Sequence, residues 1–585
     1  MRARGLLAAV AAAALALPAL AQDAVTNTPA PAPAPAPSPS PSPVPQPRVR
    51  SAPADTVGET GLVEFEAEER EPPPPPVEYP GFARRDPRIV GRLDPAALGL
   101  GANPWRGASG AFLSTLMRRT ETPLASRWAH IALRNLLMAR VPAPRSVNPV
   151  DWAAERSWLL LRMGEADGAR ILVSAVDTDR FTPKMYQIAV QSALANADPA
   201  GLCPLQGGIE EVERNIVQLV DAMCAALAGE PEAASAQLDS ARRRGRMRGV
   251  DLDLAQKVVG AGGNVRRAAT IEWEPVDRLD TWRFGLATAT GMTFPDRLID
   301  DAPVQLRAWQ AVAPMIAPID RLDSAEIATG LGVLSGQSLT DLHSLIYDAT
   351  GPDDLPDTLA WQLRLAFVGK DLETKMAAMR RLWEAPKEPL QSYAAMALLG
   401  RAASLVEPSP ELQADAPDLI ASVLAAGFDR EAARWASAVS QMDEEYADPA
   451  WAMLALGAPD GTGVDLSVRR INAFIDRDTS EGLKRSALLV AGLAGLGRID
   501  AATAGRLSSR QGLRIGRRSS WTRMIDAAAA RGQSGTVLVL TGTGLQAPEF
   551  DDIPPAHVYH SIAALKRTGQ EFTARMIASE ALART

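Results

Sequence analysis

Cysteine, histidine and aromatic residues are scarce in this sequence. The 585 residues include two cysteines, Cys203 and Cys224, and four histidines. A structural zinc site needs four nitrogen or sulfur ligands at suitable spacing, and no histidine lies near the cysteines, so we expect neither a metal nor a cofactor. Aromatic residues make up 5%, too few for a wall of stacking platforms, and the net charge of −8 opposes general binding to nucleic acid. The chain also lacks a G-x-S-x-G nucleophile elbow.

Long apolar runs are absent except at the N-terminus. Met1–Arg4 carries two arginines, Leu6–Ala21 is apolar, and the run closes on Ala-Leu-Ala. These are the three parts of a secretory signal peptide, and the run is shorter than the ~20 residues that span a bilayer. We expect residues 1–21 to be a signal peptide and the mature chain to have no membrane span. Of the 61 basic residues 54 are Arg, a bias typical of GC-rich bacterial genomes, so the expected location is the periplasm.

Residues 22–80 are rich in proline. PAPAPAPAPSPSPSPVPQP (Pro29–Pro47) alternates Pro with Ala and then with Ser, and EPPPPPVEYP (Glu71–Pro80) is a second proline run. Proline removes the amide donor and fixes φ, so these tracts favour solvated polyproline II at ~3.1 Å per residue. The acidic EFEAEEREP between them is typical of disorder. The sequence predicts a disordered linker over 22–80, with a docking motif for a partner as the alternative.

From about Gly81 the hydrophobic pattern is helical. Segments such as AERSWLLLRM, IVQLVDAMCAAL and YAAMALLGRAASLV place apolar residues three and four apart, and Gly, Pro and Asp interrupt them as helix ends require. GTVLVLTGTG (Gly535–Gly544) is the main exception, being β-branched and Gly-rich. Gly542–Ala547 imitates a dinucleotide-binding loop, but Pro548 would stop the helix that should receive the pyrophosphate. A helix or loop of the same scaffold is the better interpretation, and we predict an all-α chain of stacked helical hairpins.

A weak internal repeat supports this prediction. A glycine is followed five residues later by alanine, and after seven more by a small residue, in four places: Gly164 with Ala169, Gly229 with Ala234, Gly427 with Ala432, and Gly569 with Ala574. Gly497 with Ala502 is a fifth match, but Ser509 occupies its last position. We interpret the glycine as a helix end that adopts positive φ. The alanine and the small residue seven positions later lie on the same face of the second helix. Their small side chains allow the two helices to approach closely.

The intervals Gly164–Gly229, Gly427–Gly497 and Gly497–Gly569 are 65, 70 and 72 residues, each close to two units of a ~34-residue repeat. With the G-x4-A signature, this spacing resembles the tetratricopeptide-like α-solenoid superfamily, including its SEL1-type members. The family's aromatic and proline positions match poorly outside the first unit, where Trp152 and Pro183 lie. The resemblance implies an α-solenoid over 81–585 with a concave partner-binding face and no catalytic residue. Because 260–360 shows no unit that aligns, two sub-arrays divided within 245–360 remain an option.

The expected export changes the interpretation of the two cysteines, because thiols pair in an oxidising compartment. A helix that began near Ile209 would carry Cys224 ~22 Å along its axis, while the six residues from Cys203 to Ile209 can span ~20 Å. A structural disulfide between Cys203 and Cys224 is therefore feasible if the intervening segment folds back. Such a loop would stabilise the fold by roughly 3 kcal/mol. Two separate buried thiols are the alternative.

Two further groups of residues are weaker candidates for sites. His557 and His560 follow two aspartates, a combination that could bind a metal. However, the pair lacks the i,i+4 spacing and the Glu of a zincin helix. Two arginine clusters are placed near expected helix C-termini, where cations offset exposed carbonyls, and a patch for an anionic partner is the alternative function. The first cluster is Arg242, Arg243, Arg244, Arg246 and Arg248, and the second is Arg514, Arg517, Arg518 and Arg523.

These patterns predict a periplasmic scaffold or adaptor that binds another envelope protein, with no catalysis evident. One alternative is an enzyme that acts on envelope polysaccharide or peptidoglycan from a helical scaffold. That activity needs aromatic platforms and an acid or base, whereas the six Tyr and four His are dispersed. A second alternative is a structural component that associates with its own copies.

Overall fold

The computed structural model of the chain describes residues 80–245, 247–263, 270–386 and 388–585. The predicted signal peptide, the predicted linker up to its last residue, and Arg246 lie outside the described residues. The regular secondary structure of the described residues is almost entirely helical, as the sequence predicts. Their sheet content is one antiparallel pair of short strands, β1 (Ile89–Val90) and β2 (Val141–Pro142).

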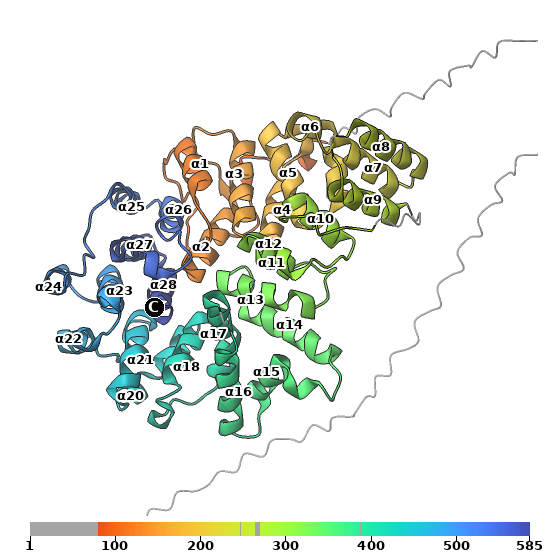
Figure 1. Ribbon diagram of the computed structural model, residues 1–585. Coiled ribbons are helices and arrows are strands. Elements are labelled where there is room, and N and C mark those ends of the chain that lie inside the picture. Colours follow the sequence, from red (N-terminus) through yellow and green to blue (C-terminus); the bar gives the residue numbers. More distant parts are fainter. Residues whose placement is uncertain (1–79, 246, 264–269, 387) are drawn as a thin grey trace, which may run out of the picture. The chain divides into compact units, whose positions relative to one another are not determined.

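The first half of the described chain runs from the N-terminal turn to the end of α14 (Figure 1). Its elements are η1 (Gly81–Ala83), α1 (Gly110–Arg119), α2 (Arg127–Met138), α3 (Pro149–Arg162), α4 (Ala166–Ser174), η2 (Thr178–Arg180), α5 (Pro183–Ala195), η3 (Pro199–Leu205), α6 (Gln206–Val212), α7 (Val217–Leu227), α8 (Pro231–Arg244), α9 (Val250–Gly262), α10 (Thr281–Ala289), α11 (Asp296–Asp300), α12 (Val304–Ala311), η4 (Ile319–Arg321), α13 (Leu322–Leu331) and α14 (Gly336–Ala349).

The second half follows the same helical pattern to the C-terminus. Its elements are η5 (Leu355–Asp357), α15 (Leu359–Val368), α16 (Leu372–Glu384), α17 (Pro389–Ala403), η6 (Pro410–Leu412), α18 (Ala416–Ala425), α19 (Asp429–Ala433), α20 (Ala436–Val439), α21 (Glu444–Gly457), α22 (Val468–Arg477), η7 (Glu481–Leu483), α23 (Lys484–Gly495), α24 (Ala501–Gln511), α25 (Ser520–Ala530), α26 (Ser534–Gly544), η8 (Phe550–Asp552), α27 (Pro555–Arg567) and α28 (Glu571–Ala583). No helix in the described part of the chain is both long and apolar enough to span a bilayer.

Glycines of the repeat pattern form tight turns between paired helices. In α3–α4, α7–α8, α18–α19 and α27–α28, the turn glycine has φ between +82° and +87°, and the next helix begins two residues later. The pattern's alanines, which follow the glycines by five residues, are fully buried: Ala169, Ala234, Ala432 and Ala574. The two helices of each pair pack against each other. A small side chain at this position allows that close approach.

The fifth match, at Gly497, has a different turn. Gly497 also has positive φ, +66°, but Asp500 caps α24, which begins four residues after the glycine instead of two. The longer turn shifts the register of the second helix. As a result Ala502 and Ser509 are exposed rather than packed against α23.

A sixth glycine turn lies directly before the β-branched, Gly-rich segment Gly535–Gly544. Gly532 has φ of +65°, and α26 begins two residues later, with Val537 fully buried at the position of the repeat alanine. The whole β-branched segment is a helix. It packs against α25, α27, α1 and α2, so apolar contacts on every side outweigh the low helix propensity of its Val, Thr and Gly residues.

Helices from near the two ends of the described chain are in contact. α2 packs against α26 and α28, and α28 also packs against α18, α21 and α23. Figure 1 shows α1 and α2 (orange) beside α26 and α28 (blue). Helices from the beginning, the middle and the end of the chain therefore share one core.

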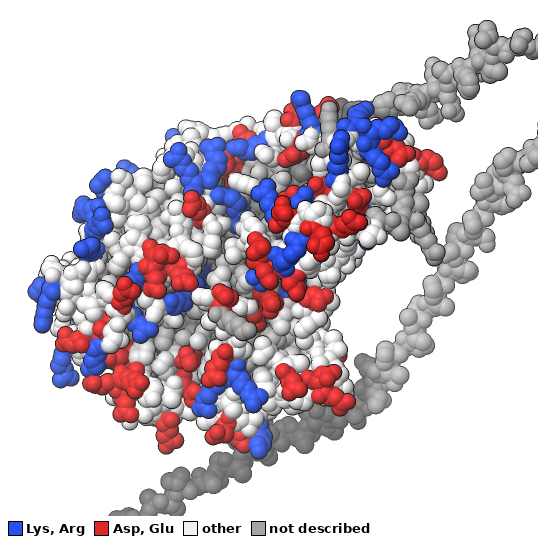
Figure 2. Space-filling view, viewed as in Figure 1, with Lys and Arg blue, Asp and Glu red and all other residues white. Residues whose placement is uncertain are grey.

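Charged side chains of both signs are spread over the face shown in Figure 2, but several arginines point inward and bind carbonyls at helix C-termini. Arg156 donates to the carbonyls of Leu137 and Ala139, 2.7 and 2.8 Å away, at the end of α2. Arg162 caps α1 in the same way, and Arg498 caps α21. A guanidinium satisfies several of the unpaired carbonyls and complements the negative end of the helix dipole. This gives the arginine-rich composition a structural use.

Candidate functional site

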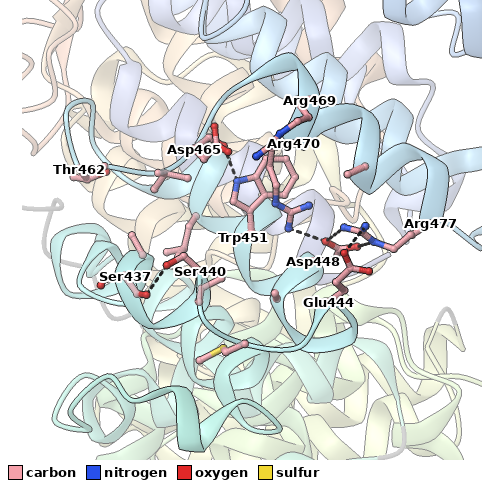
Figure 3. Close-up of a pocket in the computed structure, with 18 residues that line it drawn as sticks. Ser437, Ser440, Glu444, Asp448, Trp451, Thr462, Asp465, Arg469, Arg470 and Arg477 are labelled. Carbon is pink, nitrogen blue, oxygen red and sulfur yellow. Dashed lines mark hydrogen bonds and ion pairs between the residues drawn. The ribbon is translucent and has the colours of Figure 1, made fainter.

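A cleft of about 750 Å³ between α21 and α22 is the candidate site (Figure 3). On α21, Glu444, Asp448 and Trp451 are spaced i, i+4 and i+7, so they lie on one face of the helix. Arg470 and Arg477 have the same i, i+7 relation on α22. Ser467 caps α22 by accepting a hydrogen bond from the Arg470 amide, which fixes where this face begins.

Arg470 lies over the indole ring of Trp451. Its guanidinium carbon is 4.0 Å from the ring centroid, and its Nη2 is 2.7 Å from the carboxylate of Asp448. Trp451 itself donates to the carbonyl of Asp465 at 2.8 Å. The Nη1 group of Arg470 is buried and has no hydrogen-bond partner among the described residues. It is a positioned donor, held by a cation–π contact and one ion pair.

Arg477 joins the two helices at the other end of the cleft. It binds Asp448 through Nε and Nη2, at 2.7 and 2.9 Å, and binds Glu444 through Nη1 at 3.0 Å. The hydrogen bonds with Asp448 raise the pKa of Arg477 above its usual value. The cleft is lined by three carboxylates and three guanidiniums, namely Glu444, Asp448, Asp465, Arg469, Arg470 and Arg477. It is polar and close to neutral in total charge.

A second groove, of about 810 Å³, shares the wall made by Glu444, Asp448 and Arg477. Its other charged residues are mostly acidic: Asp418, Glu445, Asp476, Asp478 and Arg485. Burial, and then the neighbouring Asp415, raise the pKa of Asp418. Methionines and Phe474 form its apolar floor. Acidic walls over an apolar floor favour basic, amphipathic protein segments.

Cys203 and Cys224 are joined by a disulfide, with their Cα atoms 5.5 Å apart. The geometry differs from the sequence-based argument, which assumed one helix from Ile209 to Cys224. The helix is broken after Val212, and α7 begins at Val217, so that α7 returns alongside η3 and brings the cysteines together. The disulfide links η3, which contains Cys203, to α7, which contains Cys224, and it is far in sequence from the cleft.

The two histidines make separate contacts. Nδ1 of His557 is 2.9 Å from the carbonyl oxygen of Gly544, and its ring lies against Trp521, whereas Nδ1 of His560 is 2.8 Å from the carboxylate of Asp526. Burial lowers the pKa of His557. Within the described ranges, no group of three or more His, Cys, Asp or Glu side chains could hold a metal ion.

The two arginine clusters differ in their relation to the helices. Arg242, Arg243 and Arg244 occupy the last turn of α8, where cations are favoured. Arg248 follows the helix and donates to the carbonyl of Gly245. The expectation for the second cluster was wrong in part, because Arg517 and Arg518 precede the N-terminus of α25 and Arg523 lies near its start. The helix dipole does not favour cations at that end.

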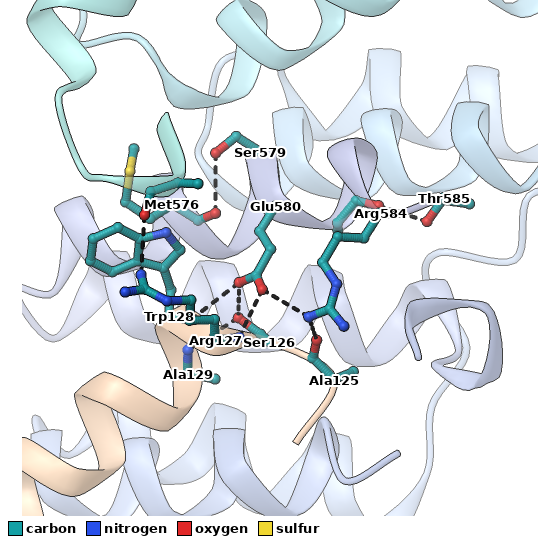
Figure 4. A network of polar contacts seen from close by, with 12 residues as sticks. Ala125, Ser126, Arg127, Trp128, Ala129, Met576, Ser579, Glu580, Arg584 and Thr585 are labelled. Atoms are coloured by element: carbon teal, nitrogen blue, oxygen red, sulfur yellow. Dashed lines mark hydrogen bonds and ion pairs between the residues drawn. The ribbon is translucent and has the colours of Figure 1, made fainter. Parts of the chain in front are cut away.

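A buried polar network connects the two ends of the described chain (Figure 4). The carboxylate of Glu580 on α28 accepts hydrogen bonds from the Arg127 amide at 2.7 Å and the Ser126 hydroxyl at 2.5 Å, at the N-terminus of α2. The Arg127 side chain then donates to the carbonyls of Thr329 and Ala425, at the ends of α13 and α18. Four helices therefore meet at two buried charges, which we assign to folding rather than to a reaction.

Sequence reasoning missed the cleft. Its signal is present as E-x3-D-x2-W on one segment and R-x6-R on the next, both at helical spacing, but nothing in the sequence indicates that the two faces meet. Comparison with family models, curated proteins and solved structures finds no match for this chain.

Proposed function

We propose that the protein is an exported α-solenoid scaffold or adaptor of the bacterial periplasm, which binds another envelope protein through its surface grooves. The observation that carries this proposal is the repeated hairpin with its glycine turn, which recurs from α3 to α28. Repeated hairpins of this kind present continuous surfaces to partners. The resemblance to tetratricopeptide-like arrays supports the same function.

The chemistry of the grooves fits a protein partner. The cleft offers paired charges, an aromatic ring already covered by Arg470, and one buried donor without a partner among the described residues. A peptide carbonyl or carboxylate would satisfy that donor. The acidic groove beside it would extend the contact along α21.

Export is supported by two independent features. The N-terminal sequence has the charged, apolar and small-residue parts of a leader. The disulfide between Cys203 and Cys224 is of a kind that persists in oxidising compartments. An alkaline phosphatase fusion after residue 80 tests this directly: activity is expected outside the cytoplasm, and a fusion that is inactive and retained in the cytosol would contradict export.

Binding is tested by affinity purification from envelope extracts with the full chain as bait. We expect one protein to be recovered at a fixed stoichiometry. Recovery should fall with Arg469→Glu, since Arg469 lines the cleft, is exposed, and forms no ion pair with a described residue. Arg567→Glu is the matched control, because Arg567 is also exposed but lies on α27 away from the cleft. Recovery of no stoichiometric partner would refute the adaptor proposal.

The two alternatives receive less support. A polysaccharide enzyme needs an open aromatic platform and a free acid or base, whereas Trp451 is only 5% exposed and Asp448 is paired with two arginines. Release of reducing ends from peptidoglycan by the purified chain would restore that alternative. Light scattering on the mature chain distinguishes an array of identical copies from a monomeric adaptor.

A further inference from the structure

A separate groove of about 670 Å³ lies between the loop before α1 and the helices α25 and α26. Three arginines line it, Arg106 from the loop and Arg523 and Arg531 from α25 and the turn after it. All three are exposed, and none forms an ion pair with a described residue. The groove therefore brings together three positive charges that no carboxylate of the described residues neutralises.

The helices α25 and α26 belong to a strongly basic part of the chain. Residues 501–548 contain seven arginines and one acid, Asp526, in a chain whose net charge is −8. Asp526 contacts His560, on α27. In Figure 2, Lys and Arg side chains gather over α25 and the segment before it. The same surface includes Arg514, Arg517 and Arg518, which are exposed in the loop from α24 to α25 and form no ion pair with a described residue.

Apolar side chains lie among these charges. Phe112 on α1 and Met524 on α25 line the groove while remaining 40% and 39% exposed, and Leu540 contributes to the same lining. Aromatic residues, methionine and arginine are the residues enriched at protein interfaces. An apolar anchor between arginines is also the arrangement that gives a binding surface its strongest contacts.

Two polar features at the groove favour a negatively charged occupant. α1 begins there, and the side chain of its N-cap residue, Ser109, makes no capping hydrogen bond. Thr536 lines the groove and is 3% exposed, yet its hydroxyl has no hydrogen-bond partner among the described residues. The N-terminus of a helix attracts anions.

We infer that this groove, hereafter the α1–α25 groove, binds an acidic segment of a partner protein that carries an apolar anchor. Carboxylates of the segment would pair with Arg106, Arg523 and Arg531, and its apolar side chain would cover Phe112 and Met524. The inference rests on the proposed adaptor function and specifies one class of partner for it. A surface made of charge alone would suit a lipid headgroup equally, but two exposed apolar side chains inside the groove favour a peptide.

A binding measurement on the full chain tests the inference. The probe is a short fluorescent peptide in which glutamates flank a leucine and a phenylalanine. We expect binding that weakens with salt, and an affinity reduced about tenfold or more in the double variant Arg523→Glu, Arg531→Glu. Phe112→Ser should weaken binding as well, since it removes the apolar contact without changing the charge. Arg567→Glu is again the matched control and should leave the affinity unchanged.

The other outcomes overturn the inference. Equal binding of the peptide to the double variant would place its site elsewhere, for instance on the arginines of α8. Preferential binding of phosphatidylglycerol vesicles, lost in the double variant, would assign the groove to lipid. If the stoichiometric partner from envelope extracts is retained by the double variant, the adaptor function stands and this use of the groove is wrong.

Discussion

The side chains of Glu326 and His343 are held on neighbouring helices, α13 and α14, away from most of the solvent. Burial, and then Asp323, raise the pKa of Glu326 from 4.5 to about 7, although Gln391 donates a hydrogen bond to it. Burial lowers the pKa of His343 from 6.5 to about 4. Both groups prefer their neutral forms in the folded protein, and they therefore affect its stability with opposite dependence on pH.

We predict that removing Glu326 and removing His343 change the pH dependence of stability in opposite directions. The contribution of Glu326 to the free energy of unfolding is fully present below pH 4.5 and is lost as the pH rises through 7. The contribution of His343 is fully present above pH 6.5 and is lost as the pH falls through 4. Each is worth about 3 kcal/mol at most. Glu326→Gln should therefore be more stable than the natural chain at pH 8, and His343→Gln should lose less stability than the natural chain on acidification. Denaturant unfolding at a series of pH values measures both changes.

The double variant is the control for this pair. Because the two contributions largely cancel between pH 4.5 and 6.5, removing both should leave a profile as flat as that of the natural chain in that range. A single variant whose profile parallels that of the natural chain would show that its side chain titrates normally, and the burial argument would then fail for that residue.

Arg156 is a buried cation whose hydrogen-bond partners among the described residues are all backbone carbonyls. Its guanidinium binds the carbonyls of Leu137, Val90 and Ala139, at 2.7, 2.8 and 2.8 Å, and its burial lowers its pKa from 12.5 to about 9. Lysine carries one ammonium and cannot reach three carbonyls in this fork geometry. We predict that Arg156→Lys lowers the free energy of unfolding by about 3 kcal/mol.

Equilibrium unfolding in urea measures this loss. The exposed Arg243 supplies the matched control, since Arg243→Lys should change stability by less than about 0.5 kcal/mol. An unchanged unfolding midpoint for Arg156→Lys would mean that water or backbone movement satisfies the carbonyls as well as the guanidinium does.

At the scale of helices and turns, two of the repeat glycines distinguish the cost of a strained backbone from the cost of a steric clash. Gly229 has φ of +82° and open space where a Cβ would be, whereas Gly164, with φ of +87°, would place a Cβ 2.6 Å from Ala308 Cβ. We predict that Gly229→Ala costs about 1–2 kcal/mol from the left-handed backbone alone. Gly164→Ala should cost clearly more, because helix α12 must also move.

Thermal unfolding of the two variants measures this difference. Gly229→Asn should recover part of the loss, since asparagine tolerates the left-handed conformation better than alanine. Equal losses for Gly164→Ala and Gly229→Ala would show that α12 moves away freely and that its contact with the α3–α4 turn contributes little.

The same turns show how far the sequence predicts the fold. Helix content and the positive φ of the turn glycines follow from local residue types, so they could be predicted. The turn at Gly532 was missed because Val537 replaces alanine and the β-branched segment hides a buried helix. The cleft between α21 and α22 could not be predicted either, since it depends on which helical faces pack together.

For the molecule as a whole, the decisive contact is the one between its most distant parts. The Arg127 amide and the carboxylate of Glu580 are 453 residues apart in sequence, and no local sequence pattern predicts their pairing. Glu580 is 2% exposed and also accepts a hydrogen bond from Arg584 at 3.0 Å. A buried carboxylate in this position stabilises the fold only because amides and guanidiniums surround it.

We predict that Glu580→Gln destabilises α2 and α28 together, because the neutral amide accepts fewer of these hydrogen bonds and leaves the Arg127 guanidinium without a nearby anion. The expected loss is about 2–4 kcal/mol, visible in hydrogen exchange as lower protection of both helices and of the ends of α13 and α18, whose carbonyls Arg127 caps. Glu571→Gln on the same helix is the matched control, since Glu571 is partly exposed and Lys566, at 3.8 Å, is its one ion-pair partner among the described residues. Reduced protection confined to α28 would mean that α2 and α28 fold independently. Loss of protection in both helices, whose contacting residues are 453 apart in sequence, would identify the network of Glu580 and Arg127 as the link between them.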